Sequence, residues 1–198
     1  MRRKNIILII TAFFCLTGCA IAVPIAVTGT AGMVAMDGRS SGKIVDDSMI
    51  ITKIKTHFAK ASANNFLTKI SVNCYEGRVM LTGILREHQY VDEAERIAWG
   101  IHGVKEVINE LTVAESPENN LLDMFISSTI KTKFLFEKSF DSLHYSYDVA
   151  DSVVYIIGVA EDEDQVNKAL QIVRSIKGVK KVVNHIILKS DRRRISKV

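Results

Sequence analysis

Two halves of the chain match each other at an offset of about 75 residues, and this duplication limits the fold more than any other feature of the sequence. Three blocks recur in the same order: residues 54–58 match 130–134, residues 79–83 match 154–158, and residues 101–109 match 176–184. Self-similarity at a fixed offset indicates a structural unit that has been copied. The sequence therefore predicts two similar domains.

Each half has the pattern of one helix, two strands, a second helix and a third strand. Apolar side chains three and four positions apart predict first helices over residues 47–60 and 121–138. Strands are predicted at 69–74, 78–85 and 105–113 in the first half, and at 144–149, 152–159 and 180–188 in the second. The two halves thus have the same predicted order of elements.

Turn-forming residues separate these segments. Glu76-Gly77 in the first half and Asp151 in the second lie where a tight hairpin is needed. Gly103 and Gly178 are predicted to end the second helices as left-handed C-caps. The order predicts an α+β fold with two tandem αββαβ domains, each a three-stranded sheet with two helices on one face.

Both predicted domains resemble the BON domain of bacterial periplasmic and outer-membrane proteins. The resemblance rests on the glycine that ends the second strand and on the Ile-x-Gly-Val-x-x-Val-x-Asn sequence that enters the third, and it extends over residues 46–188. It implies binding to phospholipid, anionic lipid in particular, a role in maintaining the cell envelope, and no catalysis. Where relatives can carry a tryptophan near the start of the second domain's first helix, this chain has Phe125.

The N-terminus has the pattern of an export signal. A basic start and an apolar run over residues 6–14 precede Leu-Thr-Gly-Cys19, which predicts a signal peptide over residues 1–18. The ending resembles the bacterial lipobox, which implies a covalent diacylglycerol and an N-acyl lipid on Cys19. Ala20, in place of the aspartate that retains enterobacterial lipoproteins at the inner membrane, implies the outer membrane. The alternative is an ordinary signal peptide or an uncleaved anchor, with Cys19 incidental.

The predicted boundaries divide the whole chain. They are a signal peptide at 1–18, a lipidated tether at 19–45, domains at 46–115 and 121–189, a linker at 116–120 and a basic tail at 190–198. Loss of the three basic residues in the signal peptide lowers the formal net charge from +4 to +1. A nearly neutral mature chain does not have the charge typical of a nucleic-acid-binding protein.

The sequence offers no pattern for catalysis or for a metal. The five histidines are scattered, and no cysteine pair has the spacing of a ligand set. The acidic run over residues 161–164 precedes a predicted helix, where capping explains it better than acid–base chemistry. Cys74 alternates with apolar residues and is predicted to be a buried strand residue without a disulfide partner. We therefore expect no catalytic residues, no metal and no cofactor besides the lipid on Cys19.

The candidate lipid-binding residues lie in the second half, whose first helix has more apolar residues than one buried face requires. They are Phe125, Ile126, Lys131 and Lys133 on that helix and Arg192, Arg193 and Arg194 in the tail. Two alternatives remain open: the surplus apolar residues cover the first domain, or the tail is a solvated charge run.

These features predict a noncatalytic envelope lipoprotein that binds an anionic phospholipid membrane through its second domain and supports outer-membrane integrity. The lipid anchor would hold the chain at the periplasmic face of the outer membrane, and a second weak contact would fix its orientation. The alternative is an adaptor that uses the same apolar surface for an envelope protein concerned with assembly or division.

Overall fold

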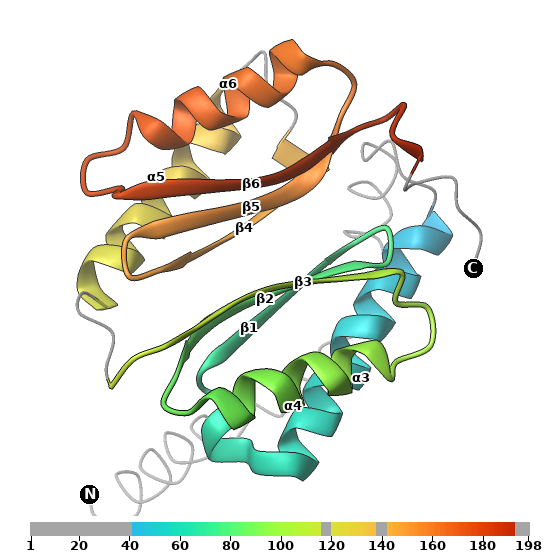
Figure 1. Ribbon diagram of the computed structural model, residues 1–198. Helices are drawn as coiled ribbons and strands as arrows, with labels where there is room; N and C mark the ends of the chain where they lie inside the picture. The colour runs from blue at the N-terminus through green and yellow to red at the C-terminus, as the bar shows by residue number, and fades with distance from the viewer. Residues whose placement is uncertain (1–40, 116–119, 138–141, 193–198) are drawn as a thin grey trace, which may run out of the picture. The chain divides into compact units, whose positions relative to one another are not determined.

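The computed structural model describes residues 41–115, 120–137 and 142–192 (Figure 1). These residues belong to one compact unit that spans residues 34–198. The predicted signal peptide, Cys19 and most of the predicted tether lie outside the described residues, as do residues 116–119 of the predicted linker. Within the described ranges, no helix combines the length and apolar character needed to cross a membrane.

The first repeat is a three-stranded sheet with two helices on one face (Figure 1). Its elements are α3 (Ser41–Phe66), β1 (Ile70–Tyr75), β2 (Arg78–Leu85), α4 (His88–Trp99) and β3 (Glu106–Val113). β2 is central and pairs antiparallel with β1 and parallel with β3. α3 is longer than predicted, because it begins six residues earlier and continues through a kink at Ser62.

The second repeat has the same architecture. Its elements are α5 (Asn120–Phe136), a short 3-10 turn (Ser142–His144), β4 (Tyr145–Ala150), β5 (Val153–Ala160), α6 (Glu163–Arg174) and β6 (Lys181–Leu188). The central strand β5 pairs antiparallel with β4 and parallel with β6. The prediction of an α+β fold with two αββαβ units is confirmed.

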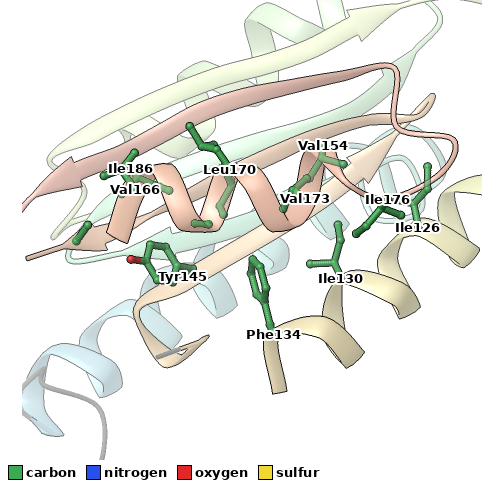
Figure 2. Close-up of a cluster of buried hydrophobic side chains, with 13 residues drawn as sticks. Ile126, Ile130, Phe134, Tyr145, Val154, Val166, Leu170, Val173, Ile176 and Ile186 are labelled. Atoms are coloured by element: carbon green, nitrogen blue, oxygen red, sulfur yellow. The ribbon is translucent and has the colours of Figure 1, made fainter. Parts of the chain in front are cut away.

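The core of the second repeat lies between its helices and its sheet (Figure 2). Ile126, Ile130 and Phe134 come from α5, four residues apart, and all three are buried. This spacing puts them on one side of the helix, because an α-helix has 3.6 residues per turn. They meet Val154 of β5 and Val173 of α6, so the position of α5 is fixed by the core.

Both hairpins turn tightly at the predicted residues, and each has a two-residue loop. Glu76 and Gly77 have φ values of 53° and 81°, and Asp151 and Ser152 have φ values of 49° and 64°. Two successive positive φ values are typical of the type I′ turn that joins tightly paired antiparallel strands.

The prediction that Gly103 and Gly178 cap the second helices is wrong. α4 ends at Trp99 and α6 at Arg174, and the residues that cap them have ordinary right-handed φ values. Gly103 and Gly178 lie in the turns that lead into β3 and β6, with φ values of 97° and 100°. The left-handed backbone at both glycines agrees with the prediction, but it lies in the turn that leads the chain into the third strand of each sheet.

The two sheets of the compact unit are in contact with each other. Buried residues of both, among them Met80 and Ile157, form a third apolar cluster. Arg78 pairs with Glu106 and donates to the carbonyl of His185 over 3.0 Å. The Thr82 hydroxyl donates to Asp148, and burial raises the pKa of that carboxyl above its ordinary value.

Candidate functional site

The side of α5 that faces away from its core is covered with large apolar side chains. With their exposed fractions they are Leu121 (83%), Met124 (70%), Phe125 (54%), Leu135 (66%) and Phe136 (79%). We call these five residues the α5 apolar face. Because they are exposed, the alternative that they cover the first repeat does not hold for them. A set of exposed apolar side chains on one helix marks an interaction surface.

Helix geometry separates this face from the core. At about 100° per residue, Phe125 projects roughly opposite to Ile130 and Phe134. Ile126, which the sequence placed among the lipid-binding candidates, is fully buried in the core of the second repeat. We therefore correct that assignment and leave Ile126 out of the candidate surface.

The polar residues within the α5 apolar face have hydrogen-bond partners in their own helix. The hydroxyls of Ser128 and Thr129 donate to the carbonyl of Phe125 over 2.9 and 2.8 Å, and Thr132 donates to Ser128 over 2.9 Å. A hydroxyl that enters an apolar environment with its hydrogen bond already made avoids most of the desolvation cost. The whole outer side of α5 is thus compatible with a low-dielectric surrounding.

Two lysines lie to either side of the α5 apolar face. Lys131 and Lys133 are exposed, and the described part of the chain provides neither with an ion-pair partner. Other lysines of the second repeat are paired, since Lys180 contacts Asp151 at 3.3 Å and Lys189 contacts Glu161 at 2.7 Å. Arg174, Lys177 and Lys181 are also exposed elsewhere in this repeat, so the lysines beside α5 are some of its accessible cationic groups.

The remaining predicted site residues are not gathered at α5. Arg192 is exposed and follows β6 on a separate segment. Arg193, Arg194 and Cys19 lie outside the described residues. The structure thus brings Phe125, Lys131 and Lys133 together on one helix.

The matching helix of the first repeat lacks this character. α3 carries two exposed large apolar residues, Val45 and Met49, which correspond to Leu121 and Phe125. Leu135 and Phe136 correspond to Ala59 and Lys60. The second repeat therefore differs from the first mainly on the outer side of this helix.

One residue that positions α5 was not singled out from the sequence. Asp123 accepts hydrogen bonds from the backbone N–H groups of Asp151 and Ser152, over 2.9 and 2.7 Å. This ties the first turn of α5 to the β4–β5 hairpin. Asp47 makes the same contacts with Glu76 and Gly77 in the first repeat, both over 2.8 Å. The sequence does contain a sign of this contact: in both α3 and α5 an aspartate lies three residues before the first buried isoleucine of the helix.

Other polar groups considered from the sequence have structural roles. Asp162, in the acidic run, accepts a hydrogen bond from the Gln165 N–H over 2.9 Å and caps α6, as predicted. Cys74 is a buried strand residue, also as predicted, and its thiol donates to Asp47 over 3.3 Å. In the described ranges, no group of three or more His, Cys, Asp or Glu side chains is arranged to hold a metal ion.

Comparisons with known proteins match this duplicated architecture. The BON domain family matches residues 46–115 and 125–190. A relative from Anaplasma centrale, named as an uncharacterized protein in the gshII 5′ region, is 32% identical over 153 residues, which are 76% of this chain and 99% of that protein.

Two further relatives have descriptive names. The outer membrane lipoprotein DolP of Haemophilus influenzae is 29% identical over 184 residues, which are 91% of this chain and 93% of DolP. The osmotically-inducible protein Y of Escherichia coli is 30% identical over 149 residues, which are 73% of this chain and 74% of that protein. With both repeats matched, the chain belongs to the BON-domain family and contains two BON domains.

Proposed function

We propose that this chain is a noncatalytic lipoprotein at the periplasmic face of the outer membrane, and that it binds anionic phospholipid through the α5 apolar face and the lysines beside it. The observation that carries the proposal is the exposure of five large apolar side chains on one side of α5. The similarity to an outer membrane lipoprotein over most of both chains supports the location. Maintenance of the outer membrane is the physiological role that we infer.

The energetics favour a membrane as the partner of this face. Transfer of one large apolar side chain from water is favourable by about 1.5–3 kcal/mol. A lysine near an anionic surface adds about 1 kcal/mol. The contributions of several apolar side chains and two lysines together give a reversible contact with the membrane. A lipid on Cys19 would strengthen this contact by keeping α5 close to the membrane surface. An envelope protein that buries the same five side chains is the competing partner.

Vesicle co-sedimentation tests the proposal, with residues 34–198 so that both the lipid anchor and the apolar N-terminus are absent. Phe125→Glu should weaken binding to vesicles that contain phosphatidylglycerol by about tenfold or more, because it exchanges an apolar side chain for a charge of the same sign as the lipid. Replacement of both Lys131 and Lys133 by Glu should abolish the preference for anionic over zwitterionic vesicles.

A matched pair of variants provides the control. Leu135→Glu changes the α5 apolar face, and Ala59→Glu makes the equivalent change on α3, where the side chain is also exposed. We expect only Leu135→Glu to reduce vesicle binding, with both variants folded by circular dichroism. Equal binding by Phe125→Glu and the unaltered segment would exclude α5 as the lipid contact and favour the adaptor alternative.

A further inference from the structure

The contact between the two repeats has an apolar centre with polar groups around it. Alternate residues of β2 lie on opposite faces of its sheet. Val79 and Leu81 belong to the core under α3 and α4, whereas Met80 is fully buried in the apolar cluster that both sheets share. Contacts between domains of one chain commonly permit relative motion unless they are large and apolar. The polar groups therefore influence how firmly the two repeats stay together.

One of the polar contacts is an ion pair that depends on pH. Nε2 of His185 on β6 lies 2.7 Å from a carboxylate oxygen of Glu110 on β3. The two side chains are only 22% and 28% exposed, so solvent screens this pair less than a pair on the open surface. Histidine is the side chain that ordinarily gains its charge between about pH 8 and pH 5. The attraction to Glu110 is therefore strongest in mildly acidic surroundings.

A second polar contact has the same dependence on pH. Asp148 on β4 accepts a hydrogen bond from the Thr82 hydroxyl on β2. Burial raises the pKa of the Asp148 carboxyl above its ordinary value, and hydrogen bonds from Thr82 and Ser71 limit this shift. Enclosure of the carboxyl thus disfavours its ionised form. The closed contact becomes less favourable as the pH rises and Asp148 ionises.

The charged groups around His185 do not reverse this direction. Arg78 donates to the carbonyl oxygen of His185 over 3.0 Å, and Glu106 pairs with Arg78. Arginine and glutamate side chains do not ordinarily change charge between about pH 5.5 and pH 8.5. Burial and the nearby carboxylate of Glu110 raise the pKa of the Tyr155 hydroxyl, which stays neutral in this range. The imidazole is therefore the group that changes charge here.

Around Asp148 the charges have mixed signs. Lys55 and Lys69 of the first repeat and Asp151 of the second line the same cleft as Asp148. Asp123 raises the pKa of Asp148 further, although burial is the larger cause. The lysines favour the ionised carboxylate, but the balance of all these effects keeps the pKa of Asp148 above its ordinary value.

One further contact between the repeats does not depend on charge. The Tyr75 hydroxyl lies 3.4 Å from Nδ1 of His144. A neutral imidazole can accept a hydrogen bond from this hydroxyl, and a charged imidazole can donate one to its oxygen. This contact is therefore available in both protonation states.

We propose that protonation controls the contact between the two repeats, which is tight in mildly acidic surroundings and loosens above neutral pH. Proton uptake by His185 strengthens its attraction to Glu110, and proton uptake by Asp148 removes a charge from the closed contact. Both steps favour the same closed state. A group whose pKa differs by one unit between the closed and open states changes their equilibrium by about tenfold. The α5 apolar face takes no part in this equilibrium.

Methyl NMR on residues 34–198, with a neutral nitroxide in the buffer, measures the opening. The nitroxide adds to the relaxation rate of a methyl group in proportion to the time that the group spends in contact with solvent. Met80 reports on the contact, Met124 on α5 is a reference for full access, and Ile54 in the core under α3 reports on unfolding. Between about pH 5.5 and pH 8.5 we expect the added rate of Met80, relative to Met124, to rise about tenfold or more while Ile54 stays protected.

Two variants shift the equilibrium in opposite directions. Asp148→Asn cannot ionise, so the rise of the Met80 rate with pH should become several-fold smaller. Glu110→Gln removes the charged partner of the imidazole, so the Met80 rate at about pH 5.5 should be several-fold higher than in the unaltered segment. His88→Gln, at an exposed position on α4, is the control and should leave the pH profile unchanged.

Three results would overturn the proposal. They are a Met80 rate that is independent of pH, a rise that Ile54 shares because the repeat unfolds, and pH profiles of Asp148→Asn and Glu110→Gln that both equal that of the unaltered segment. The measurement uses no lipid, so none of these results bears on the proposed membrane contact.

Discussion

At the scale of single residues, the most consequential side chains are the two aspartates that hold a helix to a hairpin. Asp47 is buried, and its carboxylate accepts two backbone N–H groups and the Cys74 thiol. Each hydrogen bond to a charged group contributes about 1.5–3 kcal/mol. The carboxylate thus accepts from two backbone donors of a turn whose residues have left-handed φ values.

Asp47→Ala should therefore lower the free energy of unfolding of the first repeat by about 3 kcal/mol. Urea denaturation followed by fluorescence reports on this repeat specifically, because Trp99 is the single tryptophan of the chain and lies at the end of α4. Asp46→Ala, at the exposed neighbouring position, should cost much less. Equal losses for the two variants would contradict the role assigned to Asp47.

At the scale of elements, the turn after the second helix fixes how each sheet receives its third strand. Gly178 has a φ of 100°, and a Cβ atom there would lie 2.7 Å from a Leu122 methyl carbon. The backbone conformation is strained for any L side chain, and the Leu122 methyl group of α5 would have to move to make room for a Cβ atom.

Gly178→Val should destabilise the second repeat by about 2 kcal/mol, since positive φ is especially unfavourable for a β-branched residue. Gly103→Val should have a similar effect on the first repeat, because its φ of 97° imposes the same strain. Gly100→Ala is the matched control, as Gly100 has a φ of −72°. Thermal melts in which the control is as damaging as the two valine variants would refute this explanation.

The order of helices and strands can be predicted from the sequence. The exact ends of these elements and the contacts between them cannot be predicted as well. Alternation and helical spacing are local properties, so the order of helices and strands could be derived from each repeat and checked against the other. The contact of Asp123 with the hairpin joins residues 28 and 29 positions apart, which no local pattern reveals. The surplus of apolar residues on α5 was apparent, but a run such as Met124-Phe125-Ile126 does not indicate which member points inward.

At the scale of the whole molecule, the contact between the two sheets contains a group that is sensitive to pH. Asp148 is half-buried, accepts a hydrogen bond from Thr82, and lies near the carboxylate of Asp123. Burial, the larger cause, and the nearby carboxylate both raise the pKa of Asp148, while its hydrogen bonds to Thr82, Ser71 and the Val149 backbone oppose the shift. The fold therefore favours the protonated form.

Asp148→Asn should raise the melting temperature at pH 7. The direction of this change follows from the linkage between protonation and folding. The stability contributed by the protonated Asp148 carboxyl is fully present below the unfolded pKa of about 3.9. It is lost as the pH rises through the higher pKa of the folded state. The advantage of Asp148→Asn should therefore shrink as the pH falls toward 4. Thermal melts between pH 4 and pH 7 measure this difference in melting temperature, with Asp92→Asn at an exposed position as the control. A variant that melts lower than the unaltered protein at pH 7 would contradict the prediction.

The opposed sides of α5 also have an evolutionary consequence. Its inward residues, Ile126, Ile130 and Phe134, repeat the Ile-Ile-Phe series of α3, whereas most of its outward residues differ from those of α3. Exposed positions away from such contacts usually change with little effect on stability. After duplication, selection could therefore alter what one copy presents to its surroundings while the other copy retained its original exterior, and neither would have had to abandon the common fold.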